Sequence, residues 1–339
     1  MITAIGSPAA NIAPPSRRWQ SVWRDSITDP HELLDLLGVS EKASTLLPET
    51  DTGFAMRVPR GFVARMRHGD AADPLLLQVL PQAAELLDQA GYAADPVGDG
   101  AAKVADGVIH KYQGRALLVA TGSCAINCRY CFRRHFPYAD ETASASSWRA
   151  ALAFLRSEPS ITEVILSGGD PLSLSTSKLA EFTDALSGLP QVRRLRIHSR
   201  LPIVLPERID GELLAWLART TLQKTLVVHA NHGNEIDESV RAACARLRSV
   251  DVTLFNQSVL LQGINDSVDA LADLSEALID AGVVPYYLHQ LDRVRGAAHF
   301  EVDDDSARQL IVGLRDRLPG YLVPRLVREV AGERSKSPV

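Results

Sequence analysis

The sequence predicts an α/β fold in which six strand-helix units form a barrel or an arc of one, behind an α-helical N-terminal region. From about residue 111 onward, short apolar runs typical of buried strands alternate with amphipathic patterns typical of helices. Such alternation favours a parallel sheet with right-handed crossovers. Polar residues gather where each apolar run stops, which is where barrel enzymes carry their chemistry.

The expected strands and helices follow one another regularly along the chain. The strands are expected at residues 116–121, 163–167, 194–199, 225–230, 252–257 and 284–290. The helices between them are expected near residues 147–156, 177–186, 211–219, 238–248 and 267–281.

The region before the barrel has a different composition. Residues 1–17 are rich in Pro, Ala and Ser and predict a loose arm. Residues 29–38 carry an Asp N-cap, a Pro at the first helical position and a closing Gly, and residues 74–91 carry apolar side chains at helical spacing. We therefore expect three parts: an N-terminal arm and helical region (1–105), the barrel (106–318) and a C-terminal strand with a tail (319–339).

Composition argues against several classes of function. Of 339 residues, 46% are hydrophobic and 23% charged, as in ordinary globular proteins. Lys and Arg total 36 against 41 Asp and Glu, so the basic surface that nucleic acid binding needs is not expected. The chain has neither an apolar run of the roughly 18 residues that a membrane helix requires nor the features of a signal peptide. We therefore expect a cytoplasmic protein without nucleic acid or membrane partners.

Three of the four cysteines form a compact motif. Cys124, Cys128 and Cys131 make a C-x3-C-x2-C array directly after the first barrel strand. Three thiolates on one loop suit a [4Fe-4S] cluster with one iron left free for a ligand that is not protein. Zinc is the alternative, because His135 would complete a tetrahedral set of three sulfurs and one imidazole. Cys244 lies in a helical pattern and is expected to be a small buried residue.

The motif Cys128-Arg-Tyr-Cys-Phe-Arg-Arg-His135 resembles the radical S-adenosylmethionine (SAM) enzymes, and within them the lysine 2,3-aminomutase family. That resemblance implies a partial (β/α)6 radical SAM barrel with its chemistry at the C-terminal ends of the strands. It also implies three cofactors, namely a [4Fe-4S] cluster, SAM and pyridoxal 5'-phosphate (PLP).

The resemblance assigns SAM to the ends of three strands. Gly168, Gly169 and Asp170 would contact the amino group of its methionine part, and His229 and Gln257 would help to hold it. The alternative for the first segment is an ordinary turn between strand and helix. Arg200, at the end of another strand, would face an anionic group that the sequence does not identify.

PLP is assigned to two distant segments. The resemblance makes Lys336 the lysine that binds PLP covalently, although a lysine so near the end of a chain is by default a solvated tail residue. Lys111, Tyr112 and Arg115 supply two cations and a phenol for the PLP phosphate. A solvated turn is the alternative for those three residues.

The resemblance also implies that three charges fix the substrate, L-lysine. Arg133 would bind its carboxylate through the planar guanidinium, while Asp292 and Glu329 would bind its distal ammonium. Asp292 is alternatively a helix cap. Arg134, next to Arg133, is expected to make only structural pairs.

The expected activity is conversion of L-α-lysine to β-lysine with a one-electron reductant of the flavodoxin or ferredoxin type. The segment Gly332-Glu-Arg-Ser before Lys336, Glu at position 329 and the stop soon after Lys336 resemble the shorter relatives that supply β-lysine for elongation factor P and its lysyl-ligating enzyme. A catabolic or biosynthetic aminomutase for free β-lysine is the first alternative. A zinc-stabilised binding protein without catalysis is the second. The sequence leaves homo-oligomerisation open.

Overall fold

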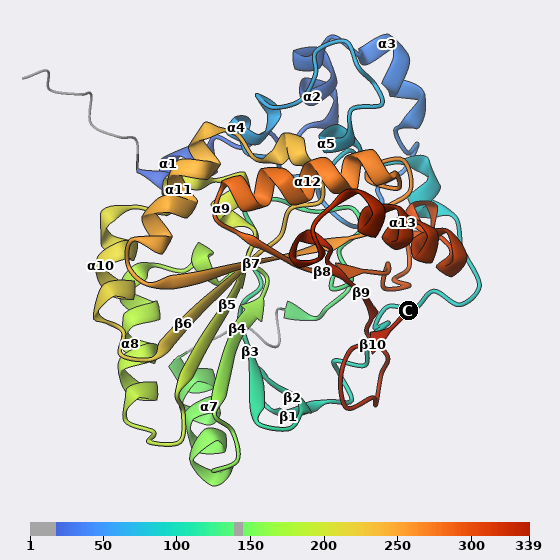
Figure 1. Ribbon diagram of the computed structural model, residues 1–339. Helices are drawn as coiled ribbons and strands as arrows, with labels where there is room; N and C mark the ends of the chain where they lie inside the picture. The colour runs from blue at the N-terminus through green and yellow to red at the C-terminus, as the bar shows by residue number, and fades with distance from the viewer. Residues whose placement is uncertain (1–17, 139–144) are drawn as a thin grey trace, which may run out of the picture.

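The computed structural model describes residues 18–138 and 145–339, and a curved ten-stranded sheet lies at its centre (Figure 1). The strands follow their order in the chain, each beside the next. They are β1 Lys103–Ala105, β2 Val108–Tyr112, β3 Arg115–Thr121, β4 Glu163–Gly168, β5 Arg194–Ser199, β6 Gln223–Val228, β7 Val252–Val259, β8 Val284–His289, β9 Arg325–Arg328 and β10 Ser337–Pro338.

Seven consecutive strands, β3 to β9, pair in parallel. The antiparallel β1–β2 hairpin extends the sheet on the β3 side, and β10 pairs antiparallel with β9 on the other side. The strand order runs from β1 to β10 without closing on itself within the described residues, so the sheet is an open arc. The six expected strands and the partial barrel are confirmed. The β1–β2 hairpin was not expected.

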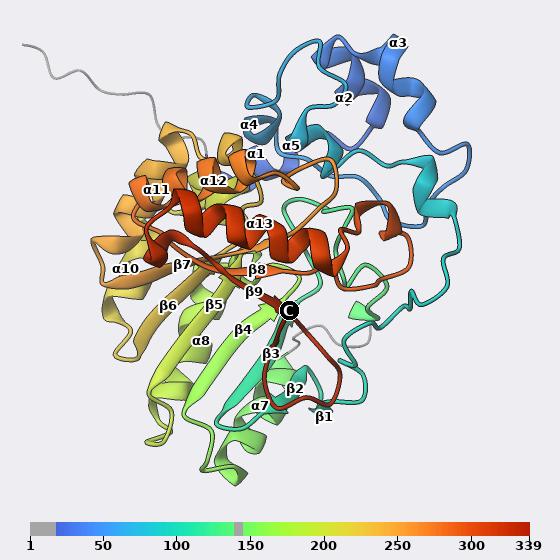
Figure 2. The same cartoon turned by 45° about the vertical axis from the view of Figure 1, so that its right-hand side comes forward.

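Helices cover the outer side of the arc (Figures 1 and 2). The long ones are α7 Ala145–Ser157, α8 Thr176–Ser187, α10 Gly211–Arg219, α11 Glu238–Arg248, α12 Val268–Asp280 and α13 Asp304–Arg317. Several begin at an Asp or Ser whose side chain accepts a backbone N–H of the first turn, as Asp210, Asp237 and Ser267 do. The five helices expected between the strands are confirmed, with bounds that differ by at most two residues.

The other helical segments are short. The α-helices are α1 Trp19–Arg24, α2 Pro30–Leu37, α3 Ser40–Ala43, α4 Arg60–Val63, α5 Pro74–Leu77 and α9 Leu201–Val204. The 3-10 turns are η1 Ser44–Leu46, η2 Ala83–Leu86, η3 Pro171–Ser173, η4 Pro206–Arg208, η5 Gly233–Glu235, η6 Ala298–Phe300 and η7 Gly320–Leu322.

The N-terminal region is only partly the helical cap that the sequence predicts. The helix expected at 29–38 is present as α2, which Asp29 caps and Gly38 ends with φ 66°. The prediction of a helix over residues 74–91 is wrong, because this segment holds only the short helix α5 and the 3-10 turn η2. Pro81 explains the break, since it lacks an N–H and disfavours helical backbone at the residue before it. The expected arm at 1–17 lies outside the described residues.

Buried apolar side chains of this N-terminal region join the main core of the barrel. Phe62 and Leu76 belong to one cluster with Leu118 and Leu166 of the sheet, and all four are almost inaccessible to solvent. Cys244 also lies in this cluster, fully buried as expected. The region is therefore packed against the barrel through its own hydrophobic face.

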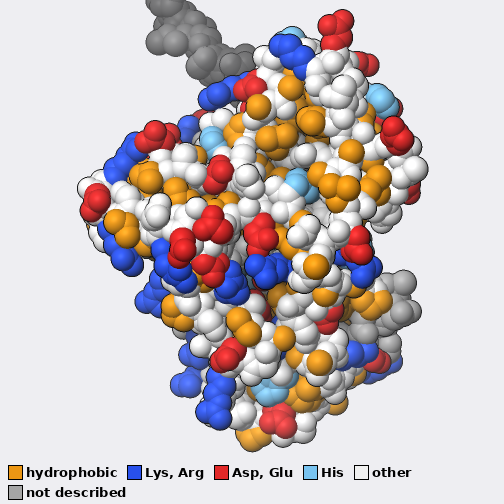
Figure 3. Space-filling view, turned by 90° about the vertical axis from the view of Figure 1, so that its right-hand side faces the viewer, with side chains coloured by type: hydrophobic (Ala, Val, Ile, Leu, Met, Phe, Trp, Pro, Cys, Tyr) orange, Lys and Arg blue, Asp and Glu red, His pale blue; other side chains and the backbone are white. Residues whose placement is uncertain are grey.

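Acidic and basic side chains lie beside one another across much of the surface shown in Figure 3. Exposed ion pairs of this kind join Arg317 of α13 to Asp269 and Asp273 of α12. No helix in the described part of the chain has the length and apolar character needed to span a membrane.

Candidate active site

One cavity of about 560 Å³ brings together all fifteen residues that the sequence assigns to the site. They come from the loop after β3, from the ends of β4, β6, β8 and β9, from β2, β3 and β7, and from the C-terminal tail. These residues are Lys111, Tyr112, Arg115, Cys124, Cys128, Cys131, Arg133, Gly168, Gly169, Asp170, His229, Gln257, Asp292, Glu329 and Lys336. The structure therefore brings the predicted residues to one cavity, while the role of each residue remains a prediction.

The cysteine loop is fixed against the end of β4. Gly169 N–H donates to the carbonyl of Thr121 at 2.6 Å, and Asp170 N–H donates to the carbonyl of Ser123 at 2.8 Å. A Cβ on Gly168 would approach the Thr121 carbonyl oxygen to 2.8 Å, and one on Gly169 would approach the Ser123 oxygen to 2.6 Å. The two glycines are therefore needed for close packing of backbone on backbone.

The N-terminal region supports the same loop from the other side. The buried carboxylate of Glu85 pairs with both Arg129 and Arg134, and Arg134 also donates to the carbonyl of Gly296 at 3.0 Å. The expectation that Arg134 makes structural pairs is confirmed. Glu85 was not singled out from the sequence, because its partners lie more than 40 residues away.

The three thiols of the loop are half-buried and line the same cavity. Burial raises the pKa of the Cys131 thiol to about 11, and burial together with the neighbouring thiols raises that of Cys124 well above its usual value. Thiolates at this position therefore require a positive partner. Three soft sulfur donors with an open side toward a cavity fit an iron-sulfur cluster.

His135 does not complete a zinc set with these thiols. Its ring Nε2 lies 3.1 Å from the carbonyl oxygen of Arg295, the side chain is exposed, and it faces a second, smaller cavity. Among the described residues, no group of three His, Cys, Asp or Glu side chains is arranged to hold a single metal ion.

The carboxylate of Asp170 fastens the end of β4 to the end of β5. It accepts from the hydroxyl of Ser199 at 2.7 Å and from the backbone N–H groups of Leu172, Arg200 and Leu201 at 2.7 to 3.0 Å. Burial raises the pKa of Asp170 to about 6, although these donors oppose the shift. Because the side chain has four internal partners, a ligand at this segment would mainly meet the backbone of Gly168 and Gly169.

Two imidazoles on the cavity wall have a buried nitrogen without a partner. His229, after β6, and His198, on β5, each leave Nε2 unsatisfied, and their rings meet edge to face at 5.8 Å. Burial lowers the pKa of His229 to about 3 and that of His198 well below its usual value, so both rings are neutral. Unsatisfied buried nitrogens on a cavity wall fit a site that binds a polar ligand. His198 had no assigned role in the sequence analysis.

Lys336 lies among titratable groups at the other end of the cavity. Its Nζ is 3.2 Å from Glu329 Oε2 and 3.2 Å from His289 Nε2. Burial lowers the pKa of Lys336, although Glu329 and Asp292 counteract this effect. Lys336 is therefore not a solvated tail residue. His289 is a further residue that the sequence analysis did not assign.

The two carboxylates near Lys336 differ in their environments. Burial raises the pKa of Asp292 to about 7, and no helix begins there, so the helix-cap alternative does not hold. Burial would also raise the pKa of Glu329, but Lys336 and Lys111 outweigh it and hold this pKa below its usual value. Both acidic side chains line the cavity, as the sequence predicts.

Asp99 links the predicted phosphate and carboxylate sites. Lys111 Nζ lies 2.7 Å from Asp99 Oδ1, and Arg133 Nε lies 2.7 Å from Asp99 Oδ2. Burial would raise the pKa of Asp99, but the two cations hold it below its usual value. Arg133 also donates to Ser167 Oγ at 3.0 Å. Asp99 follows no apolar strand, so the pattern of polar strand ends could not find it.

The remaining predicted phosphate ligands stand next to Glu329. The guanidinium of Arg115 lies 4.5 Å above the ring of Tyr112, and Tyr112 hydrogen-bonds the Glu329 carboxylate. These residues lie on β2 and β3 rather than in a solvated turn.

The chain is similar to known proteins over nearly its whole length. The L-lysine 2,3-aminomutase of Escherichia coli (strain K12) is 50% identical over 327 residues, which cover 96% of this chain and 95% of that protein. The protein of the same name from Haemophilus influenzae is 42% identical and covers 97% and 98%. That from Clostridium subterminale is 34% identical, with 95% of this chain and 77% of the relative covered.

No protein-family model matches the chain. Among solved structures, a radical SAM methyltransferase from Sphaerobacter thermophilus is similar, with a TM-score of 0.47 and 16% identity over 65% of this chain and 68% of that one.

A partial α/β barrel whose strand ends surround one deep cavity with titratable walls is the architecture of a barrel enzyme. The two relatives that are 50% and 42% identical over nearly the whole length of this chain show which family it belongs to. The chain belongs to the L-lysine 2,3-aminomutase family and is an isomerase. The resemblance found in the cysteine motif is thereby confirmed.

Proposed function

We propose that the protein converts L-α-lysine to β-lysine with a [4Fe-4S] cluster, SAM and PLP. One observation carries the proposal: a three-thiol loop and a half-buried lysine next to two acidic side chains line the same cavity. The relatives named L-lysine 2,3-aminomutase support the substrate.

The cofactors would supply the hard chemistry. When bound, the cluster and SAM supply a carbon radical that removes a hydrogen atom from an unactivated carbon, and PLP supplies the group through which the amine migrates. Cys124, Cys128 and Cys131 would hold the cluster, and His229, Gln257 and the backbone at Gly168 and Gly169 would hold SAM.

The chain's own residues would orient the substrate and its amine. Lys336 would bind PLP and later displace the product, and its lowered pKa favours the neutral, nucleophilic amine. Burial keeps His289 neutral by lowering its pKa well below the usual value, and its Nε2, 3.2 Å away, is suited to accept a hydrogen bond from the Lys336 Nζ. Lys111, Tyr112 and Arg115 would bind the PLP phosphate.

The charges would select a diamino acid. Arg133 would bind the carboxylate, while Asp292 and Glu329 would bind the distal ammonium. An amino group already lies at one of them, since Lys336 Nζ is 3.2 Å from Glu329 Oε2. A substrate without the second amine would leave them unpaired, so alanine should react far more slowly than lysine. Comparable rates with the two substrates would refute this assignment.

Anaerobic incubation with lysine, SAM, PLP and a reductant, followed by chiral chromatography, tests the activity. Lys336→Ala should abolish turnover and leave the iron content and cluster absorption unchanged, because Lys336 is separate from the thiol loop. Full activity in this variant would remove PLP from the mechanism. A colourless protein with one zinc and no iron would favour the non-catalytic alternative.

We further propose a cytoplasmic enzyme whose β-lysine modifies elongation factor P, with a flavodoxin or ferredoxin as reductant. Glu329 and the segment Gly332-Glu-Arg-Ser, which resemble the aminomutases that supply β-lysine for elongation factor P, support this use over a catabolic one. Incubating the reaction products with elongation factor P and its lysyl-ligating enzyme should add one β-lysyl mass. Equal transfer of α-lysine in a competition would argue against it.

A further inference from the structure

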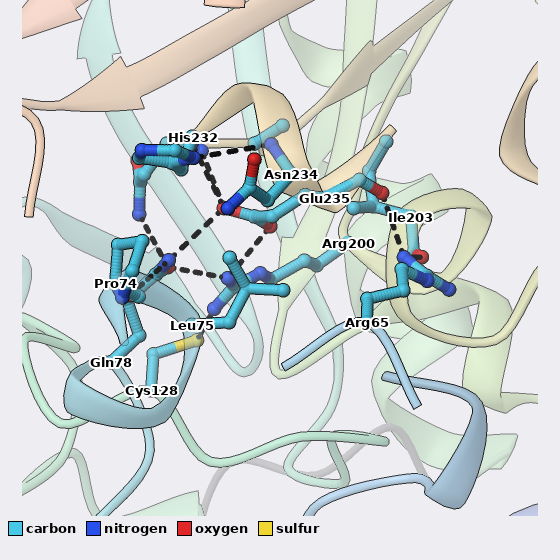
Figure 4. Close-up of polar contacts among 12 residues, drawn as sticks. Arg65, Pro74, Leu75, Gln78, Cys128, Arg200, Ile203, His232, Asn234 and Glu235 are labelled. Carbon is cyan, nitrogen blue, oxygen red and sulfur yellow. Dashed lines mark hydrogen bonds and ion pairs between the residues drawn. The ribbon is translucent and has the colours of Figure 1, made fainter. Parts of the chain in front are cut away.

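Arg200 is the charged residue of the cavity whose partner the sequence did not identify. It follows β5 directly, and its backbone N–H donates to Asp170 Oδ2 at 2.7 Å, which fixes the start of the side chain. The guanidinium then reaches across to the cysteine loop, where Nη1 donates to Cys128 Sγ at 2.7 Å (Figure 4).

The other side of the same guanidinium meets a buried acid. Arg200 Nη2 donates to Glu235 Oε2 at 3.0 Å and to Gln78 Oε1 at 2.7 Å. Glu235 is inaccessible to solvent, and only 6% of Arg200 is exposed. Water therefore screens neither the charge on Arg200 nor that on Glu235 from the Cys128 sulfur.

Both groups are held in place by further contacts. Glu235 Oε1 accepts from the backbone N–H groups of Asn231 and His232 at 2.8 and 3.1 Å and from Gln78 Nε2 at 3.1 Å. Figure 4 shows this chain of contacts running from η5 through Gln78 and Arg200 to the sulfur. A guanidinium fixed in this way keeps its direction toward the sulfur without a ligand to order it.

We propose that Arg200 and Glu235 set the reduction potential of the iron-sulfur cluster by acting in opposite directions through Cys128. This inference rests on the proposed function, which makes Cys128 a cluster ligand. Reduction adds negative charge to the cluster, and hydrogen bonds and net charge around the sulfurs set its potential. Arg200 stabilises the reduced form and raises the potential, while Glu235 offsets part of that charge.

The test is a redox titration of reconstituted protein, followed by electron paramagnetic resonance of the reduced cluster, without SAM or lysine. At the potential where the wild-type cluster is half reduced, Arg200→Gln should show about a tenfold lower ratio of reduced to oxidised cluster. That is about 59 mV for a one-electron couple and matches the loss of one hydrogen bond to a charged group. Glu235→Gln, which keeps the shape of the side chain, should raise the ratio.

Two further variants separate charge from packing. Arg200→Lys keeps the charge and should retain most of the wild-type ratio. Arg208→Gln is the matched control, because Arg208 is also a fully buried arginine but bonds to the carbonyl of Leu172 and does not line the cavity. Its ratio should equal that of wild type.

A wild-type ratio in Arg200→Gln would overturn the inference and leave Arg200 a purely structural residue or a SAM ligand. If Arg200→Gln takes up no iron, Glu235→Gln decides: a raised ratio supports the inference, and an unchanged or lowered one refutes it. Wild-type protein that forms no cluster would refute the proposed function instead. The two failures are therefore distinguishable.

Discussion

Glu85 is a single acid between two buried cations, and its removal should be one of the most damaging changes outside the cavity. Its carboxylate pairs with Arg129, which is inaccessible, and with Arg134, whose side chain is 1% exposed. Glu85→Gln keeps the volume but leaves both guanidiniums without a counter-ion in a dry environment. Breaking a buried ion pair from one side costs about 3 to 5 kcal/mol.

Such a loss is large against a total stability of about 5 to 15 kcal/mol. Urea unfolding of the cofactor-free protein measures it, and iron uptake on reconstitution measures whether the cysteine loop is still held. Both should fall, because Arg129 and Arg134 belong to that loop. Glu238→Gln is the control, since this exposed acid pairs with Arg241 on the surface and should cost at most about 0.5 kcal/mol. A loss below about 1 kcal/mol for Glu85→Gln would refute the reasoning.

Two more predictions concern the cavity. Burial raises the pKa of Asp292 to about 7, so between about pH 4 and 7 the folded chain keeps a proton that the unfolded chain has released, and stability falls as the pH rises through this window. Asp292→Asn should therefore be more stable than wild type by about 1 kcal/mol or more at pH 8 and by little at pH 4. Urea unfolding of both proteins at pH 4 and at pH 8 measures this difference. An equal gain in stability at the two pH values would contradict the prediction. Gly169→Ala should lower stability by about 1 to 3 kcal/mol and reduce iron uptake, because its Cβ would meet the Ser123 oxygen at 2.6 Å. Gly211→Ala, with open space around its Cβ, should change neither, and equal effects of both substitutions would rule out the packing explanation.

The barrel was predictable because its signals are local. Each parallel strand is a short apolar run, and the helices α8, α10, α11, α12 and α13 begin at a capping Ser or Asp of their own, so neither signal depends on distant residues. The cavity was predictable for the same reason, since parallel strands bring their C-terminal ends to one edge. The separate cysteine and C-terminal motifs added the residues that this rule does not cover.

The parts that were missed depend on partners far away in the chain. Asp99 takes its role from Lys111 and Arg133, and neither spacing has a periodic pattern. Glu85 and Gln78 lie in the segment where a long helix was expected, and their function is visible only in contact with the cysteine loop and η5. Pro81 is a local signal, however, and by itself predicts that a helix beginning near residue 74 ends before it.

The contacts around Arg200 also indicate at which stage of protein synthesis the proposed iron site can be completed. Gln78 and Glu235 are 157 positions apart in the chain, yet they hydrogen-bond to each other next to Arg200, which donates to Cys128 Sγ. Both Gln78 and Glu235 must have left the ribosome before the contacts that position Arg200 against the Cys128 sulfur can form. We therefore expect iron delivery to follow synthesis of the chain beyond Glu235, so that the thiol loop and its supporting contacts are in place before the metal arrives.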